Sequence, residues 1–143
     1  MDILEKIPYK SNQAVVFDID DTLISSENGK LIPKVYEIYN YCRNKGYIIY
    51  IITARGGTSY VINITRRQLH SLGITGYKKV FFRHPMDLMV AKYKKNIRKD
   101  IPENIIMSIG DQPGDIGEYG GYGLLVKRPK PTPSFFQSLL TFI

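Results

Sequence analysis

Residues 14–23 read AVVFDIDDTL, a short apolar run that ends among acids at Asp18, Asp20 and Asp21. The run from Ala14 to Ile19 is typical of a strand that is buried on both faces, as the strands of a parallel sheet are. Residues 47–52, YIIYII, repeat the pattern and are also followed by polar residues. We therefore predict two buried parallel strands, each delivering polar side chains at its carboxyl end.

The rest of the chain alternates between helical and extended patterns. A helix is predicted from Pro33, which suits the first helical position, to Gly46, where a left-handed cap is needed. Further helices are predicted at residues 59–72, 87–98 and 134–142, strands at 79–82, 105–109 and 123–126, and a loop at 53–58. This order predicts one α/β domain over residues 1–143, a Rossmann-like three-layer α/β/α domain with a mostly parallel central sheet.

Length and composition are those of an ordinary globular protein. The chain has 143 residues, of which 43% are hydrophobic and 23% charged, enough for a core without disulfides. Its one cysteine, Cys42, has no partner for an internal disulfide. The first residues do not form a secretory signal, and no apolar run approaches the roughly 20 residues that span a bilayer. We expect a soluble, cytoplasmic protein with no membrane partner.

The net charge is +7, from 20 Lys and Arg against 13 Asp and Glu. Four of the acids are assigned below to one site, so the rest of the surface is more basic than the total indicates. A positive field favours anionic partners such as phosphorylated small molecules or nucleic acid. The alternative is an ordinary lysine-rich surface with no such partner.

Polar residues follow four of the predicted strands. Ligands of open parallel sheets bind outside the carboxyl ends of the strands, so these residues should share one edge. They are Asp18 and Asp20 after the first strand, Thr53 and Arg55 after the second, Arg83 and His84 after the third, and Asp111 after the fourth. Clustered carboxylates need a cation to offset their repulsion, and oxygen ligands without cysteine suit Mg²⁺ better than zinc or copper.

These residues fall in a recognisable set of motifs. FDIDDTL (17–23), Thr53 at the end of YIIYIIT, and IGDQPGD (109–115) resemble motifs of the haloacid dehalogenase-like (HAD) superfamily. Its third motif, a lone lysine, is matched by Lys94, although Lys92 and Lys95 stand beside it. YKKNIR (93–98) and VKRP (126–129) are similar to the acid-phosphatase-like branch. Shorter matches, TAR (53–55), TRR (65–67) and FFR (81–83), are similar to polynucleotide 3'-phosphatases.

The resemblance implies a role for each site residue. Asp18 is expected to attack phosphorus and form an aspartyl-phosphate, and Asp20 to act as general acid and then general base. Thr53 is expected to hydrogen-bond the phosphoryl group and Lys94 to neutralise its oxygens. For Thr53 the alternative is a strand-end hydroxyl that satisfies a turn, and for Lys94 it is a solvated lysine on a helix face.

The resemblance also implies a metal site. Mg²⁺ is expected on Asp18, on Asp20 through its backbone carbonyl, and on Asp111. Asp115 either joins these ligands or orients Lys94 from behind. Arg55 and Arg83 lie at the same predicted edge and are candidates for contacts with the substrate beyond its phosphate, the alternative being surface exposure.

The spacing leaves no room for the cap domain that many relatives insert after the first or second motif. A site without a cap needs a bulky substrate or a second subunit, as in a homo-oligomer, to cover it. We therefore predict a capless Mg²⁺-dependent phosphomonoester hydrolase, acting on a nucleotide or another phosphomonoester. A polynucleotide 3'-phosphatase, or a nucleic-acid-binding protein on the same fold, is the alternative.

Overall fold

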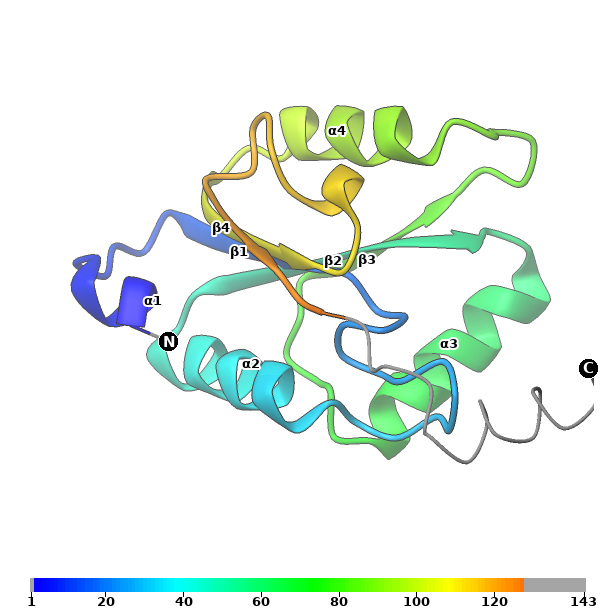
Figure 1. Ribbon diagram of the computed structural model, residues 1–143, viewed down its shortest axis with the longest axis horizontal. Coiled ribbons are helices and arrows are strands. Elements are labelled where there is room, and N and C mark those ends of the chain that lie inside the picture. Colours follow the sequence, from blue (N-terminus) through cyan, green and yellow to red (C-terminus); the bar gives the residue numbers. More distant parts are fainter. Residues whose placement is uncertain (1, 128–143) are drawn as a thin grey trace, which may run out of the picture.

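The computed structural model describes residues 2–127, and five strands form its central sheet (Figure 1). Every pairing is parallel, and the order is β3-β2-β1-β4-β5. The strands are β1 (Gln13–Phe17), β2 (Ile48–Gly56), β3 (Lys79–Arg83), β4 (Asn104–Gly110) and β5 (Tyr122–Leu125). The α/β class with a parallel sheet is confirmed, and the helix expected at 134–142 lies outside the described residues.

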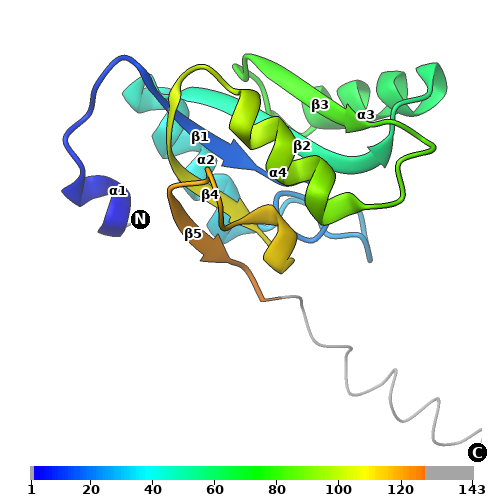
Figure 2. The same cartoon turned by 90° about the horizontal axis from the view of Figure 1, so that it is seen from above.

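Helices cover both faces of the sheet (Figures 1 and 2). α2 (Pro33–Lys45) and α3 (Ser59–Ser71) lie on one face, and α4 (Val90–Asp100) lies on the other with the 3₁₀ turn η1 (Pro113–Asp115). A short helix, α1 (Asp2–Lys6), precedes the sheet and was not expected from the sequence. The described residues thus form the predicted three layers. Among the helices of residues 2–127, we find no candidate for a membrane span.

The alternation of side chains along β1 divides the core in two. Val15 and Phe17 face the cluster that includes residues of α2 and α3, whereas Ala14 and Val16 face the cluster beneath α4. All four side chains are at most 3% exposed. Burial on both faces explains why this strand is an unbroken apolar run.

Two element boundaries differ from the sequence prediction in ways that shape the site. β2 continues through Gly56, where a loop was predicted from residue 53, because Gly56 pairs with Arg83 of β3 after a register shift. α4 begins at Val90 and not at Asp87. Residues 84–89 instead form a loop that is held by backbone hydrogen bonds, described below.

Candidate active site

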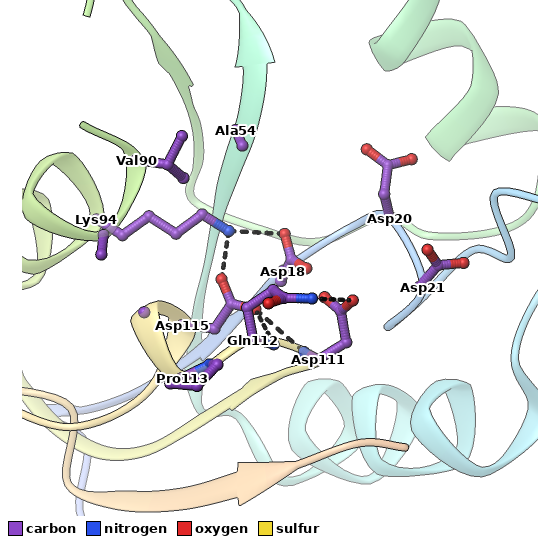
Figure 3. Close-up of a pocket in the computed structure, with 12 residues that line it drawn as sticks. Asp18, Asp20, Asp21, Ala54, Val90, Lys94, Asp111, Gln112, Pro113 and Asp115 are labelled. Carbon is purple, nitrogen blue, oxygen red and sulfur yellow. Dashed lines mark hydrogen bonds and ion pairs between the residues drawn. The ribbon is translucent and has the colours of Figure 1, made fainter. Parts of the chain in front are cut away.

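A cavity of about 480 Å³ opens at the carboxyl ends of the strands. Its lining combines five acids and one lysine with apolar groups from β2, α4 and η1: Asp18, Asp20, Asp21, Asp111, Asp115, Lys94, Ala54, Val90, Ala91 and Pro113, together with Gln112 and Gly114. Figure 3 shows the acids of the two Asp-rich motifs converging on it. The sheet therefore assembles residues from distant parts of the chain at the edge that the sequence predicted.

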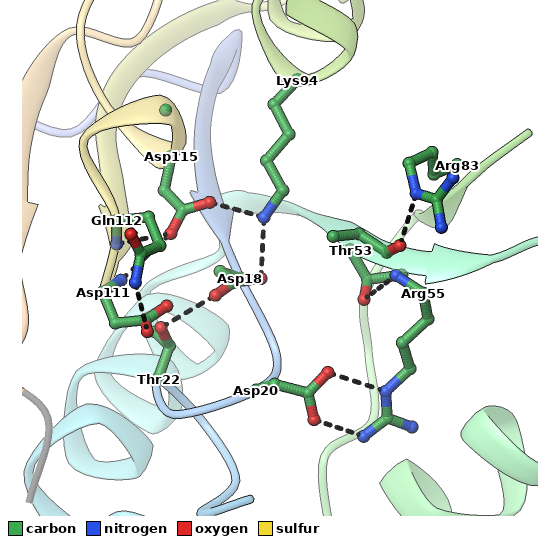
Figure 4. Close-up of polar contacts among 12 residues, drawn as sticks. Asp18, Asp20, Thr22, Thr53, Arg55, Arg83, Lys94, Asp111, Gln112 and Asp115 are labelled. Atoms are coloured by element: carbon green, nitrogen blue, oxygen red, sulfur yellow. Dashed lines mark hydrogen bonds and ion pairs between the residues drawn. The ribbon is translucent and has the colours of Figure 1, made fainter. Parts of the chain in front are cut away.

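Lys94 lies at the centre of the buried charges. Its Nζ donates to Asp18 Oδ1 at 2.8 Å and to Asp115 Oδ1, and all three side chains are at most 8% exposed (Figure 4). Its neighbour Lys92 is exposed and Lys95 only half-buried. Of these three adjacent lysines, Lys94 is the one that the fold delivers to the cavity.

The charges in this cluster do not balance. Burial raises the pKa of Asp18 to about 7, although the nearby Lys94 ammonium opposes the shift. Burial would lower the pKa of Lys94, but the carboxylates of Asp18 and Asp115 outweigh it and raise that pKa. One ammonium lies between two carboxyl groups, and burial keeps Asp18 partly protonated near neutral pH; a cation bound beside it would favour the ionised form of Asp18.

Asp115 is held from two sides. Its Oδ2 accepts the backbone N–H groups of Asp111 and Gln112, at 3.1 and 3.0 Å, while Oδ1 accepts from Lys94. Gly110 makes room for it, because a Cβ there would stand 2.1 Å from the Cβ of Asp115. This geometry has Asp115 orienting Lys94 and the turn that carries Asp111.

Three carboxylates are placed closely enough to share a metal ion. One oxygen each from Asp18, Asp111 and Asp115 lies within 4.8 Å of the others. The donors are all hard oxygens, and Asp18 and Asp111 come from the ends of adjacent strands, so the residues present fit a magnesium-like cation.

The side chain of Asp20 points away from these carboxylates (Figure 4). It forms a bidentate ion pair with Arg55, with Oδ1 2.8 Å from Nη2 and Oδ2 3.0 Å from Nε. Arg55 is fixed in turn, because its Nη1 donates to Thr65 and Gln68 of α3. The Asp20 carboxylate still lines the cavity and is 42% exposed.

Thr53 lies at the predicted place on β2 but does not line the cavity. Its side chain is fully buried, and its Oγ1 accepts the backbone N–H of Arg55 at 3.1 Å. The next residue, Ala54, forms part of the cavity wall instead.

Arg83 is engaged with the backbone on the described part of the chain. Its Nε donates to the carbonyl of Ala54 at 2.9 Å, and its Nη1 lies within 2.7–3.3 Å of three carbonyls in the loop before α4, those of His84, Pro85 and Asp87. These contacts make Arg83 the anchor of that loop.

Three residues that support the site received no role from the sequence. The hydroxyl of Thr22 donates to Asp18 Oδ2 at 3.1 Å. The hydroxyl of Tyr93 lies 3.0 Å from the carbonyls of both Thr53 and Phe81, and Arg98 donates to three carbonyls of the loop after β4. For Tyr93 and Arg98 the sequence did hold a signal, which is helical spacing: residues 93, 94 and 98 share one face of α4, so a role for Lys94 points to its two neighbours on that face.

Comparison with protein-family models gives one match. The model described as HAD superfamily, subfamily IIIB (Acid phosphatase) matches residues 26–132, beginning after the Asp18 and Asp20 motif. No curated protein matches the chain significantly.

Solved structures with a similar fold include phosphatases and larger assemblies. The class C acid phosphatase from Bacillus anthracis with tungstate bound aligns with a TM-score of 0.62 at 14% identity, covering 99% of this chain and 83% of that one. A chain of the Pnkp1/Rnl/Hen1 complex aligns with a TM-score of 0.68 at 17% identity, and the match covers 84% of this chain. The match covers only 47% of that chain, so this protein spans less than half of its length. At these identities the likeness shows the fold.

The family match covers most of the chain, including the segment with Lys94, Asp111 and Asp115, which supplies eight of the twelve residues that line the cavity. The cavity lies where the parallel strands end, on the fold that the acid phosphatase structure shares. The chain therefore belongs to the acid phosphatase family, subfamily IIIB of the HAD superfamily, a family of phosphoric monoester hydrolases.

Proposed function

We propose that this protein is a Mg²⁺-dependent phosphomonoester hydrolase that uses Asp18 as its nucleophile. The observation that carries the proposal is the buried Asp18–Lys94–Asp115 cluster beside Asp111, at the carboxyl edge of a parallel sheet. A carboxylate nucleophile next to an ammonium group is suited to an anionic phosphate, because the ammonium offsets the repulsion between them.

In the first step an oxygen of Asp18 attacks phosphorus, and the bond from phosphorus to the leaving oxygen breaks. Asp20 donates a proton to that oxygen, which leaves as an alcohol, and an aspartyl-phosphate remains on Asp18. In the second step Asp20 takes a proton from water, whose oxygen attacks phosphorus; the bond from phosphorus to the Asp18 oxygen breaks, which releases phosphate and restores the Asp18 carboxylate. Asp20 must leave Arg55 to reach the leaving oxygen, and the 42% exposure of its carboxylate gives it room to turn.

Asp18 and Asp111 would hold the metal ion, with the backbone carbonyl of Asp20 as a further ligand. When bound, the ion neutralises charge between the nucleophile and the phosphoryl oxygens. Asp115 is the least suited of the three carboxylates to bind the metal ion directly, because its oxygens already accept hydrogen bonds from Lys94 and from two backbone N–H groups.

The substrate we propose is a nucleotide or another small phosphomonoester. The second candidate is a 3'-phosphorylated nucleic-acid end, which the fold shared with a chain of the Pnkp1/Rnl/Hen1 RNA repair complex supports. Arg83 does not add to that support, because its guanidinium is engaged by backbone carbonyls, and Arg55 becomes available to a substrate only when Asp20 turns away from it. Turnover of nucleotides against 3'-phosphorylated oligonucleotides separates the two candidates.

The deciding experiment measures hydrolysis of a chromogenic phosphomonoester with Mg²⁺ or with chelator. We expect Mg²⁺-dependent turnover that Asp18→Asn abolishes. Asp21→Asn is the matched control, because Asp21 lines the same cavity but its carboxylate is occupied by Ser26. Asn also tolerates the positive φ of 59° at that position. Substantial activity in Asp18→Asn, or equal loss in both variants, would reject Asp18 as nucleophile.

A further inference from the structure

The loop between β3 and α4 exposes a run of large apolar side chains. We name residues 84–89 the rim loop. Met86, Leu88 and Met89 are 80%, 85% and 63% exposed, and Val90, which follows the loop as the first residue of α4, is 38% exposed. Single exposed apolar residues are common, but four within five positions form a patch of the kind that marks a binding surface.

The rim loop is shaped by hydrogen bonds and is not a slack connection. Besides the contacts from Arg83, the N–H of Asp87 donates to the carbonyl of His84 at 2.9 Å. The N–H of Met86 donates to Nδ1 of His84, and that of Met89 to the carboxylate of Asp87, both at 3.1 Å. The polar groups of the loop hydrogen-bond to one another while its apolar side chains face outward. The loop therefore holds these side chains ready for binding, with little conformational entropy left to lose.

The patch continues into the active-site cavity. Val90 and Ala91 line the cavity wall, and Lys94 follows one turn further along α4 (Figure 3). A substrate with its phosphate at Asp18 and Lys94 therefore has an apolar wall beside it that extends outward onto the rim loop. In the described residues no cap domain is inserted between β2 and α4, so the leaving group of a substrate can reach this surface.

We propose that the rim loop binds the leaving group of the substrate and selects an aromatic body, of the size of a phenyl ring or nucleobase. This inference rests on the proposed function and names the substrate class for the same site. The four apolar side chains of the patch have no hydrogen-bond donor and no charge, and the polar side chains of the loop, His84 and Asp87, accept backbone N–H groups of the loop itself. The patch therefore suits an aromatic ring better than a sugar or a second anionic group. Methionine suits a flat ring, because its flexible thioether packs well against aromatic faces.

The test compares benzyl phosphate with ethyl phosphate, which present the same phosphoryl group on a large aromatic or a small aliphatic alcohol. The variant is Leu88→Ser/Met89→Ser, and the matched control is Tyr60→Ser, since Tyr60 is 74% exposed on α3 and does not line the cavity. We expect kcat/KM for benzyl phosphate to fall about tenfold in the double variant, mainly through KM, as removal of two apolar contacts predicts. The value for ethyl phosphate should change less than twofold, and the control should match wild type.

Other outcomes overturn the proposal in different ways. Equal loss for both esters, or unchanged kcat/KM for benzyl phosphate in the double variant, removes the rim loop as the binding surface. If wild type associates in size-exclusion chromatography and the double variant is a monomer with undiminished benzyl preference, the surface binds a second copy instead. Hydrolysis of neither ester by wild type with Mg²⁺ rejects the proposed function itself, whereas hydrolysis of both without preference rejects only the role of the loop.

Discussion

The acids of the first motif differ sharply in their surroundings, although they are close in sequence. Asp18 is buried and bound by Lys94 and Thr22, while Asp20, two residues later, is half-exposed and paired with Arg55. A buried carboxylate held in place suits nucleophilic attack, and a more exposed one that can turn suits proton transfer. Asp21 adopts a positive φ and closes a turn with Ser26. The three aspartates therefore have three distinct environments.

We predict that Asp20→Asn separates the two steps of the reaction. Nitrophenolate leaves without a proton, so nitrophenyl phosphate should give a stoichiometric burst followed by slow turnover, because the second step still lacks its base. Ethyl phosphate needs the proton in the first step and should show no burst, with kcat lowered about 10²–10⁴-fold. Rapid-mixing kinetics measures both. Equal loss for the two esters, with no burst, would argue against Asp20 as the general acid and base.

At the scale of elements, α4 organises the site from one face of the sheet. Tyr93 reaches carbonyls of β2 and β3, Lys94 reaches the carboxylates, and Arg98 reaches the loop after β4. The guanidinium of Arg98 is buried and donates to the carbonyls of Gly114, Ile116 and Glu118 at 2.9–3.2 Å. One helix thus links three strands to the turn that carries Asp111 and Asp115.

Arg98→Met should loosen that turn while leaving the catalytic residues in the chain. Three carbonyls lose a donor and water replaces it only in part, so we expect about 2 kcal/mol less stability. The Mg²⁺ concentration for half-maximal activity should rise, because the loop that holds Asp111 is less fixed. Lys92→Met, at an exposed position on the same helix, is the control for both measurements. An unchanged Mg²⁺ titration in Arg98→Met would show that Arg98 does not position the site.

A second inter-element contact lies away from the cavity and provides a pH test. Burial would raise the pKa of Glu103, but hydrogen bonds from Lys78 and Tyr50 outweigh it and hold the pKa below its usual 4.5. A lowered folded-state pKa stabilises the protein above the unfolded value, and this stabilisation is lost as pH falls through the folded value. We expect Glu103→Gln to lower the free energy of unfolding, measured with urea, by about 1–2 kcal/mol at pH 7 and by less below pH 4. A cost that does not shrink in acid would contradict this assignment.

For the whole molecule, the distinctive feature is an open site on a basic chain. The net charge is +7, and two of the five acids that line the cavity, Asp18 and Asp115, are buried, which leaves the outer surface more positive than the total indicates. Such a field attracts phosphorylated molecules over distances set by ionic strength. The rim loop then supplies the specificity that a cap supplies elsewhere.

Binding at the site should stabilise the whole domain. Beryllium fluoride, which mimics a phosphoryl group, should raise Tm with Mg²⁺ present by on the order of 10 °C at a hundredfold excess over Kd. Neither Mg²⁺-free beryllium fluoride nor fluoride alone should do so, and Asp111→Asn should abolish the shift at the same Mg²⁺ concentration. Thermal unfolding followed by circular dichroism measures it. An equal shift without Mg²⁺ would contradict the metal site.

The sequence predicted the architecture because its signals are local. Apolar runs such as AVVF indicate buried strands through their own composition, and Pro33 and Gly46 bound α2 through their backbone preferences. The family motifs then placed Asp18, Asp111 and Lys94 at one edge, and the cavity lining agrees with that placement. The predicted end of β2 was wrong. Gly56 is a residue type typical of turns, but here it pairs with Arg83 of a strand that comes later in the chain.

The sequence by itself therefore determined the layers, the parallel sheet and the edge at which the acids gather, since these follow from periodicity and from where strands end. Only the tertiary structure decided that Lys94 and not its neighbours contacts Asp18, 76 positions away, and that Asp20 pairs with Arg55. It also decided that Arg83 anchors the rim loop and leaves the apolar side chains exposed. These outcomes depend on which side chains meet across separate elements, and that geometry exists only once the chain has folded.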